Sequence, residues 1–390
     1  MSSRPVPLVL KVWNDPKFRA IFYQVVAVTL VGVGLWYLIS NTLHNLSARN
    51  IATGFDFLGR EAGFAIGESS LAYTPADTYA RALSVGLLNT LRVAVIGIVF
   101  ATLLGTLIGI ARLSGNWLIA KLASIYVEVM RNIPLLLQLF FWYALIAETL
   151  PGPRQALSPI AGVFLSNRGF KIPTVEGDGL TWLAAGFFIA VVIVLVLANW
   201  SRRRQAQTGQ IFPVFKTAAL LLIACPLVAW WLSGSALALE IPALKGFNFQ
   251  GGLTLSPEFA ALLIGLVIYT AAFVAEVVRS GIESVGKGQW EAAGAIGLRR
   301  GLILRLIVLP QALRVIIPPM TSQYLNITKN SSLAVAIGYP DLVSVVNTTL
   351  NQTGQAIEGI MIIMGAYLTV SLAISVIMNW YNARMALVER

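Results

Sequence analysis

The chain has 390 residues, of which 57% are hydrophobic and only 12% are charged, about half the charged fraction of an ordinary soluble domain. This composition excludes a soluble globular protein and predicts an all-α polytopic membrane protein. The formal net charge of +11 does not point to nucleic acid, because membrane proteins carry cationic loops on their cytoplasmic side. The single cysteine, Cys225, and the single histidine, His44, exclude an intrachain disulfide and provide no metal-ligand cluster.

Eight uncharged apolar segments predict about eight transmembrane helices along the chain. The first segment is too long for the core of a signal peptide, and no small-residue cleavage site follows it. We therefore expect it to be retained as a span. In chain order the segments are 20–40, 93–111, 132–147, 179–201, 217–239, 259–275, 315–328 and 359–383.

Lys and Arg are concentrated in alternate connecting segments, which predicts that both termini lie in the cytoplasm. Residues 1–80 then comprise an N-terminal cytoplasmic tail, an extra span and a periplasmic stretch. The periplasmic stretch, 54–68, is amphipathic, and we expect it to lie along the outer face of the membrane. A plain periplasmic loop is the alternative. Its apolar residues are Phe55, Phe57, Leu58, Phe64 and Ile66.

Two features of the next segments predict helix contacts. Gly105 and Gly109 form a G-x-x-x-G pattern, which predicts tight packing of the second span against a neighbouring one. The alternative is two flexible glycines without a partner, because glycine is common in membrane helices. Glu128 and Arg131 lie three residues apart, so we expect them to pair on one helix face.

Three segments are shorter than the roughly 20 residues that cross a bilayer, and prolines at 134, 318 and 319 interrupt two of them. Short or broken helices are tolerated where they face protein or a water-filled pathway. These segments, which we expect at the centre of the protein, are 132–147, 259–275 and 315–328.

The pair of segments at 179–201 and 217–239 is longer and more uniformly apolar. Because this pair crosses the membrane and returns, its insertion leaves the topology of the other spans unchanged. We therefore interpret residues 81–385 as one transmembrane domain, interrupted by an insertion at about 151–255 that carries two extra spans.

The largest basic loop contains an incomplete phosphate-binding motif. Gly281, Gly286 and Lys287 fit the G-x-x-x-x-G-K start of a P-loop, but Gly288 stands where Ser or Thr would bind Mg²⁺. The loop also follows an apolar helix, whereas a P-loop follows a buried strand. The sequence therefore predicts no nucleotide site, and it offers no nucleophile or acid–base cluster for an enzyme.

The following stretch, "EAAGAIGLRRGLILRLIVLP", resembles the EAA loop of ABC importer permeases. Its helix-favouring part contains Ala292 and Ala293, whose small side chains allow another surface to approach closely. Gly297 allows the backbone to turn at the helix end, and Pro310 is suited to the start of the next helix. An ordinary amphipathic connector is the alternative. The matching residues are Glu291, Ala292, Ala293, Gly297, Ile307, Leu309 and Pro310.

The resemblance covers most of 82–150 and 255–385 and extends to the polar amino acid subfamily of these permeases. It is greatest to the longer, Q-type permease subunit of general L-amino acid importers, which has an extra N-terminal span and an extra outside stretch. The resemblance implies a type I permease core of five helices in a bacterial inner membrane. It also implies import of L-amino acids, with a second permease subunit, two cytoplasmic ATPase subunits and a periplasmic binding protein as partners. ATP and Mg²⁺ would be bound by the ATPase, and this chain would need no cofactor.

Polar residues of the seventh segment and the residues after it are candidates for the substrate pathway. An amino acid zwitterion needs hydrogen-bond donors and acceptors in a dry environment, because unpaired charges there are costly. Hydrogen bonds between helices are the alternative role. The candidates are Thr321, Gln323, Asn326, Thr328, Lys329, Asn330, Ser331 and Ser332.

A secondary transporter or channel that works without an ATPase is the rival class. Such proteins often show an inverted internal repeat and ionisable residues near the middle of the membrane. The sequence shows no clear repeat, and its acidic residues fall at the ends of the spans.

Overall fold

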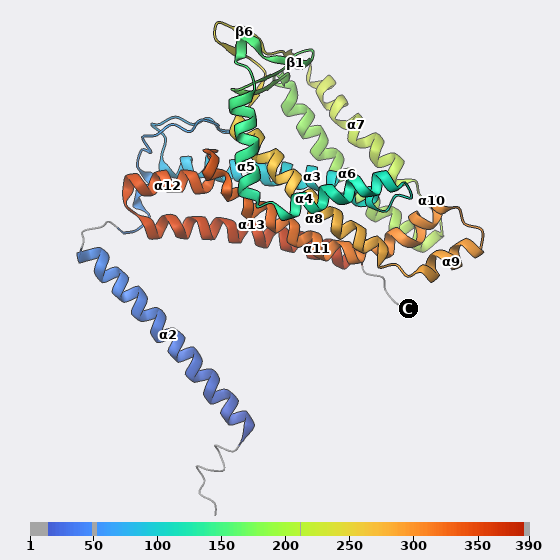
Figure 1. Cartoon of the computed structure of the whole chain (residues 1–390), viewed down its shortest axis with the longest axis horizontal. Helices are drawn as coiled ribbons and strands as arrows, with labels where there is room; N and C mark the ends of the chain where they lie inside the picture. Colours follow the sequence, from blue (N-terminus) through green and yellow to red (C-terminus); the bar gives the residue numbers. More distant parts are fainter. Residues whose placement is uncertain (1–14, 49–52, 211, 386–390) are drawn as a thin grey trace, which may run out of the picture. The chain divides into compact units, whose positions relative to one another are not determined.

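The computed structural model describes residues 15–48, 53–210 and 212–385 (Figure 1). In this part of the chain, seven helices are long and apolar enough to cross a membrane, or eight if one bent pair forms a single span. The prediction of an all-α membrane protein with about eight spans is confirmed. The candidate spans are 16–45, 79–112, 179–208, 214–233, 257–283, 300–337 and 356–384, and the bent pair covers 117–149.

The described residues divide into two compact units. In the first, α2 (Pro16–Ala48) exposes almost all of its side chains, as a lipid-facing helix would. Phe57 lies in the short turn η1 (Asp56–Gly59) and is only 1% exposed. It packs with Tyr79, at the start of α3 (Tyr79–Arg112), and with Leu342 of α12 (Leu342–Thr353). The amphipathic stretch thus has one aromatic residue buried within this unit.

The second unit is built around α8 (Pro257–Glu283), the candidate span with the largest buried share among the described residues. The hydroxyl of Ser256 accepts a hydrogen bond from the amide of Phe259 (3.0 Å), and Pro257 occupies the first turn. Both features favour a helix start at this point, because they satisfy or remove amide groups that the helix leaves unpaired.

The G-x-x-x-G pattern lies where α3 crosses α8. A Cβ atom added to Gly105 would lie 2.5 Å from the Cβ of Val274 and 2.7 Å from the carbonyl oxygen of Ala271. A Cβ at Gly109 would lie 2.8 Å from the carbonyl oxygen of Ala275. The predicted tight packing is confirmed, because no side chain larger than hydrogen fits at either position.

Replacing Gly105 with leucine is expected to lower the free energy of unfolding by about 1–3 kcal/mol or more, because the added atoms overlap α8. Gly365→Leu in α13 (Ala356–Met385) is a matched control, since a Cβ there meets no atom within 4 Å. Unfolding of the purified chain in detergent, followed by tryptophan fluorescence, measures both. Equal stability of the two variants would contradict the close packing of α3 on α8.

A sharp bend separates α4 (Trp117–Asn132) from α5 (Leu135–Ala144), whose axes meet at 102°. Ile133 adopts an extended conformation, as residues before proline do. The buried side chain of Gln138 donates from Nε2 to the carbonyls of Met130 (3.0 Å) and Ile133 (3.1 Å). These hydrogen bonds replace those that the broken helix loses, so Gln138 stabilises the bend.

The insertion contains a helical hairpin and short strands. The helices α6 (Gly179–Thr208) and α7 (Val214–Ser233) lie side by side (Figure 1). The strands β4 (Thr174–Glu176) and β5 (Ala238–Glu240) pair antiparallel where the chain enters and leaves this hairpin. These strands were not predicted from the sequence.

Two further sheets flank the hairpin in the sequence. A four-stranded antiparallel sheet has the order β1 (Leu157–Ile160), β2 (Val163–Ser166), β3 (Gly169–Ile172) and β8 (Leu253–Leu255). β6 (Ala243–Lys245) and β7 (Asn248–Gln250) form a separate two-stranded ribbon. Lys171 of β3 donates a hydrogen bond to Thr254 of β8, and its burial lowers the pKa of its ammonium group.

A broken helical run follows α8 in the second unit. α9 (Lys287–Ala295) and α10 (Arg300–Ile303) are followed by the π-helical turn η4 (Leu304–Val308) and α11 (Leu309–Asn330). α11 packs along α8, and the 3₁₀ turn η5 (Ser331–Ile337) follows it. The motif residues and the pathway candidates therefore lie on consecutive elements beside the central helix.

Candidate functional site

The E-A-A motif forms a short helix, α9, with two different faces. Its inner residue Ala293 is 2% exposed and packs in one apolar cluster with Val285 and Ile303. Its outer residues Glu291 and Ala292 are exposed, and Ile296, just past the helix, is 75% exposed. Small side chains beside an exposed carboxylate and an exposed isoleucine form a surface that another protein can approach closely.

Gly297 ends this helix in a left-handed conformation, with φ of +78°. Its amide donates to the carbonyl of Gly294 (2.9 Å), and the amide of Leu298 donates to Ala293 (3.2 Å). A residue with a side chain would be strained at this φ. The turn directs Leu298 back into the apolar cluster that holds Ala293. The expected role of Gly297 at the helix end agrees with this geometry.

Pro310 lies in the first turn of α11, as expected, but α11 continues an earlier helical run and does not follow a loop. The helical run already begins at Arg300, and the π-helical turn η4 lies immediately before Leu309 and Pro310. A proline has no amide hydrogen, so it cannot donate to the preceding turn of an α-helix. A wider turn in front of Pro310 accommodates this loss within a continuous helix, and such turns are frequent at functional sites.

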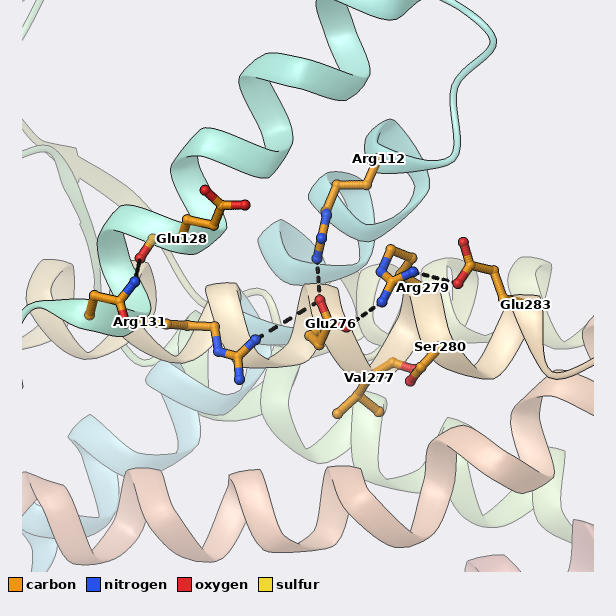
Figure 2. A network of polar contacts seen from close by, with 9 residues as sticks. Arg112, Glu128, Arg131, Glu276, Val277, Arg279, Ser280 and Glu283 are labelled. Atoms are coloured by element: carbon orange, nitrogen blue, oxygen red, sulfur yellow. Dashed lines mark hydrogen bonds and ion pairs between the residues drawn. The ribbon is translucent and has the colours of Figure 1, made fainter.

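A cluster of five charged side chains lies close to the end of α8 that leads into the motif (Figure 2). Glu276, with 28% of its side chain exposed, accepts hydrogen bonds from Arg112 of α3 and from Arg279 (2.5 Å). Arg131 of α4 lies 4.0 Å from the same carboxylate, and Arg279 also pairs with Glu283. One carboxylate thus holds α3 and α4 against α8.

The prediction that Arg131 pairs with Glu128 is wrong, because Arg131 pairs with Glu276 instead. Among the described residues no ion pair joins these two side chains, and Figure 2 shows Arg131 directed toward Glu276. The guanidinium of Arg131 also lies over the ring of Phe273, 5.1 Å from its centre. Glu276 is partly buried whereas Glu128 is exposed, so water screens the attraction of Arg131 to Glu276 less.

The structure separates the eight pathway candidates into two groups. Four hydroxyls donate to carbonyls three or four residues earlier in the chain, so their oxygens can act toward a ligand only as acceptors. The other four make no side-chain hydrogen bond with any described residue. The first group is Thr321, Thr328, Ser331 and Ser332, and the second is Gln323, Asn326, Lys329 and Asn330.

Gln323, Asn326 and Asn330 follow one another at spacings of three and four residues, so their amides share one face of α11. Asn326 is exposed, and the other two are partly exposed. Pro318 and Pro319 lie in the same helix and remove two amide donors from its backbone. α11 therefore combines a line of available amides with a weakened hydrogen-bond ladder.

Sequence reasoning missed Arg112, Arg279 and Gln138 as functional or structural residues. A charged residue at the end of an apolar segment usually extends to the membrane interface, which made Arg112 unremarkable. The signal for Gln138 is weak but readable: a buried polar residue lies four positions after a proline that breaks a helix.

Comparison with known proteins identifies the family. The family described as "Binding-protein-dependent transport system inner membrane component" matches residues 183–387. The chain belongs to this permease family. It is 53% identical to the putative amino-acid ABC transporter permease protein YhdX of Escherichia coli K12, over 96% of both chains. The resemblance predicted from the motif is confirmed.

Two further relatives specify the subfamily. This permease is 51% identical to the general L-amino acid transport system permease protein AapQ of Rhizobium johnstonii, over 96% of this chain and 94% of the relative. It is 41% identical to the glutamate/glutamine/aspartate/asparagine transport system permease protein BztB of Rhodobacter capsulatus, over 96% of each. Both alignments run through the N-terminal span and the insertion, so these extra segments belong to the relatives as well.

Proposed function

We propose that this permease is the membrane-spanning subunit of an ATP-driven importer that moves L-amino acids from the periplasm to the cytoplasm. The exposed face of α9 carries the proposal: Glu291 and Ala292 are presented to a partner, while Ala293 fixes the helix to the apolar cluster below. A partner that moves α9 also moves the ends of α8 and α11, because all three share that cluster.

This arrangement suits a two-state mechanical coupling. Closure of a separate ATPase would push on α9, and α8 would transmit the movement to α3 and α4 through Glu276. ATP binding then biases the permease between two conformations and does no chemistry on the substrate. In this proposal ATP and Mg²⁺ are held by two ATPase subunits, and the coupling residues are Glu291, Ala292, Ala293, Gly297, Leu309 and Pro310.

The proposal assigns the remaining steps of transport to other subunits. A second, homologous permease chain would complete the pathway, and a periplasmic binding protein would deliver the amino acid. The concentration of Lys and Arg near α9 supports a position of this helix on the cytoplasmic side of a bacterial inner membrane, and in this proposal both termini are also cytoplasmic. Residues 81–385 would form the transmembrane domain, with the insertion at 151–255 as an addition.

The substrate would pass along the face of α11 that carries Gln323, Asn326 and Asn330. Their amides supply both donors and acceptors, which an amino acid zwitterion needs when it leaves water. The names of the two subfamily relatives support L-amino acids as the substrate class, with polar side chains among those accepted.

Uptake by membrane vesicles tests the proposed energy source. Right-side-out vesicles with ATP inside, the assembled complex in the membrane and the binding protein outside are expected to accumulate a radiolabelled L-amino acid without any ion gradient. Vesicles without ATP but with an imposed proton or sodium gradient are expected to show no uptake above background. Gradient-driven uptake in the absence of ATP would favour a secondary transporter and contradict the proposal.

A further inference from the structure

A cavity of about 920 Å³ opens beside the coupling helix. It lies between the C-terminal end of α3, the start of α4, the end of α8 and the run from α9 to α11. Its volume is near the upper end of the roughly 300–1,000 Å³ that small-molecule sites occupy. The pathway candidates on α11 do not line it, so this cavity is separate from the proposed route of the substrate.

The wall of the cavity is mostly apolar. Ile110 of α3, Ile119 of α4 and Leu304 of η4 line it from three sides, and all are substantially exposed. Trp290 of α9 contributes an aromatic surface. Apolar side chains left exposed at the end of membrane helices suit contact with hydrocarbon rather than water.

Three cations join this apolar wall. Lys287, Arg300 and Arg305 line the same cavity, and all three are exposed. None of them forms an ion pair or a side-chain hydrogen bond with any described residue. Glu283 is the only acid among the described residues that line the cavity, and it already pairs with Arg279. The cavity therefore has an unbalanced positive charge that its own residues do not neutralise.

We propose that this cavity binds an anionic phospholipid. The headgroup phosphate lies among Lys287, Arg300 and Arg305, and an acyl chain lies against the apolar wall formed by α3 and α4. Basic pockets between membrane helices at the cytoplasmic side are suited to lipid headgroups, because they combine positive charge with a nearby hydrocarbon phase. The lysine of the incomplete P-loop thus contributes to a phosphate site, with a lipid in place of a nucleotide.

An inorganic phosphate would satisfy the cations but leave the apolar wall exposed to water, so a lipid fits the whole cavity better. Its position also gives the lipid a role. A phospholipid between α3 and α9 supports the element that the proposed ATPase pushes, so anionic lipid is expected to raise coupling. The role of the lipid in coupling and the cytoplasmic position of the cavity rest on the proposed function. Binding of the lipid to the cavity does not.

Lipid retention by the purified full-length chain tests the site without ATP or transport, so its failure is distinguishable from failure of the importer proposal. The chain is exchanged into detergent with equal amounts of phosphatidylglycerol and phosphatidylcholine of identical acyl chains. Native mass spectrometry then counts the retained lipids. Wild-type protein is expected to retain phosphatidylglycerol preferentially. The double variant Arg300→Gln/Arg305→Gln is expected to bind it about 30-fold more weakly, because each cation near a headgroup contributes about 1 kcal/mol.

Arg203→Gln/Lys216→Gln removes the same charge from α6 and α7, outside the cavity, and should change retention less than about twofold. Arg300→Lys/Arg305→Lys keeps the charge and should retain the lipid, while unfolding temperatures confirm that each variant is folded. Equal losses in the cavity and control variants would overturn the site. The site would also be overturned if inorganic phosphate displaced the lipid, or if phosphatidylglycerol were absent once the ATPase is bound.

Discussion

Replacing Glu291 with lysine is expected to abolish copurification of the ATPase with this permease. Glu291 is exposed on α9, so its side chain does not stabilise the permease itself. In the proposed complex it lies at the centre of the contact, where a reversed charge is desolvated beside a surface suited to a carboxylate. A central interface residue of this kind costs at least about 2 kcal/mol when altered, or roughly 30-fold in affinity.

The same variant is expected to keep its unfolding free energy within about 0.5 kcal/mol of the wild type, as substitutions at exposed positions usually do. Glu176→Lys in β4 is a matched control, because it makes the same charge change at an exposed residue outside the motif. Pull-down of the ATPase through a tag on the permease measures both variants. Unchanged copurification of Glu291→Lys with the ATPase would contradict the role proposed for α9.

The second large effect is expected at Glu276. Glu276→Gln keeps the shape of the side chain but leaves Arg112 without a negative partner and Arg279 with Glu283 alone. Breaking a fully buried ion pair costs about 3–5 kcal/mol. Because Glu276 is 28% exposed, we expect a smaller loss of about 2 kcal/mol in the free energy of unfolding. Titration of the purified chain with a denaturing detergent measures this loss.

Glu283→Gln on the same helix is the control, since Glu283 is 50% exposed and, within the described part of the chain, pairs with Arg279 alone. An exposed pair contributes about 0–1 kcal/mol, so this variant should remain close to the wild type. Adding Arg112→Gln to Glu276→Gln should recover part of the loss, because the double variant no longer contains that unpaired cation. If the loss of unfolding free energy in the double variant equals the sum of the losses in Glu276→Gln and Arg112→Gln, Glu276 does not hold α3 to α8.

Some of the site could be predicted from local sequence because its chemistry is local. The motif around Glu291 has fixed spacing, and Gly297 occupies a turn that only the backbone of glycine adopts without strain. The packing of Gly105 and Gly109 was also predictable, since four-residue spacing places both on one helix face.

Other parts of the site depend on segments far apart in the chain. Arg112 and Glu276 are separated by 164 positions, and nothing in either neighbourhood specifies the other. The cavity beside α9 likewise needs α3, α4 and α8 to be in place. The bend at Pro134 was suggested by the proline, but its stabilisation by Gln138 required the positions of the α4 carbonyls.

The sequence by itself predicted that this protein crosses the membrane repeatedly and which segments are candidate spans, and it contains a stretch that resembles the EAA loop of ABC importer permeases. These properties follow from hydropathy, charge distribution and fixed spacing, all of which are written along a continuous stretch of chain. Only the tertiary structure decided which arginines hold Glu276, which amides among the pathway candidates remain available, and where unneutralised cations meet an apolar cavity. Those outcomes depend on which distant side chains become neighbours, and the strength of each charge depends on how much water its neighbours exclude.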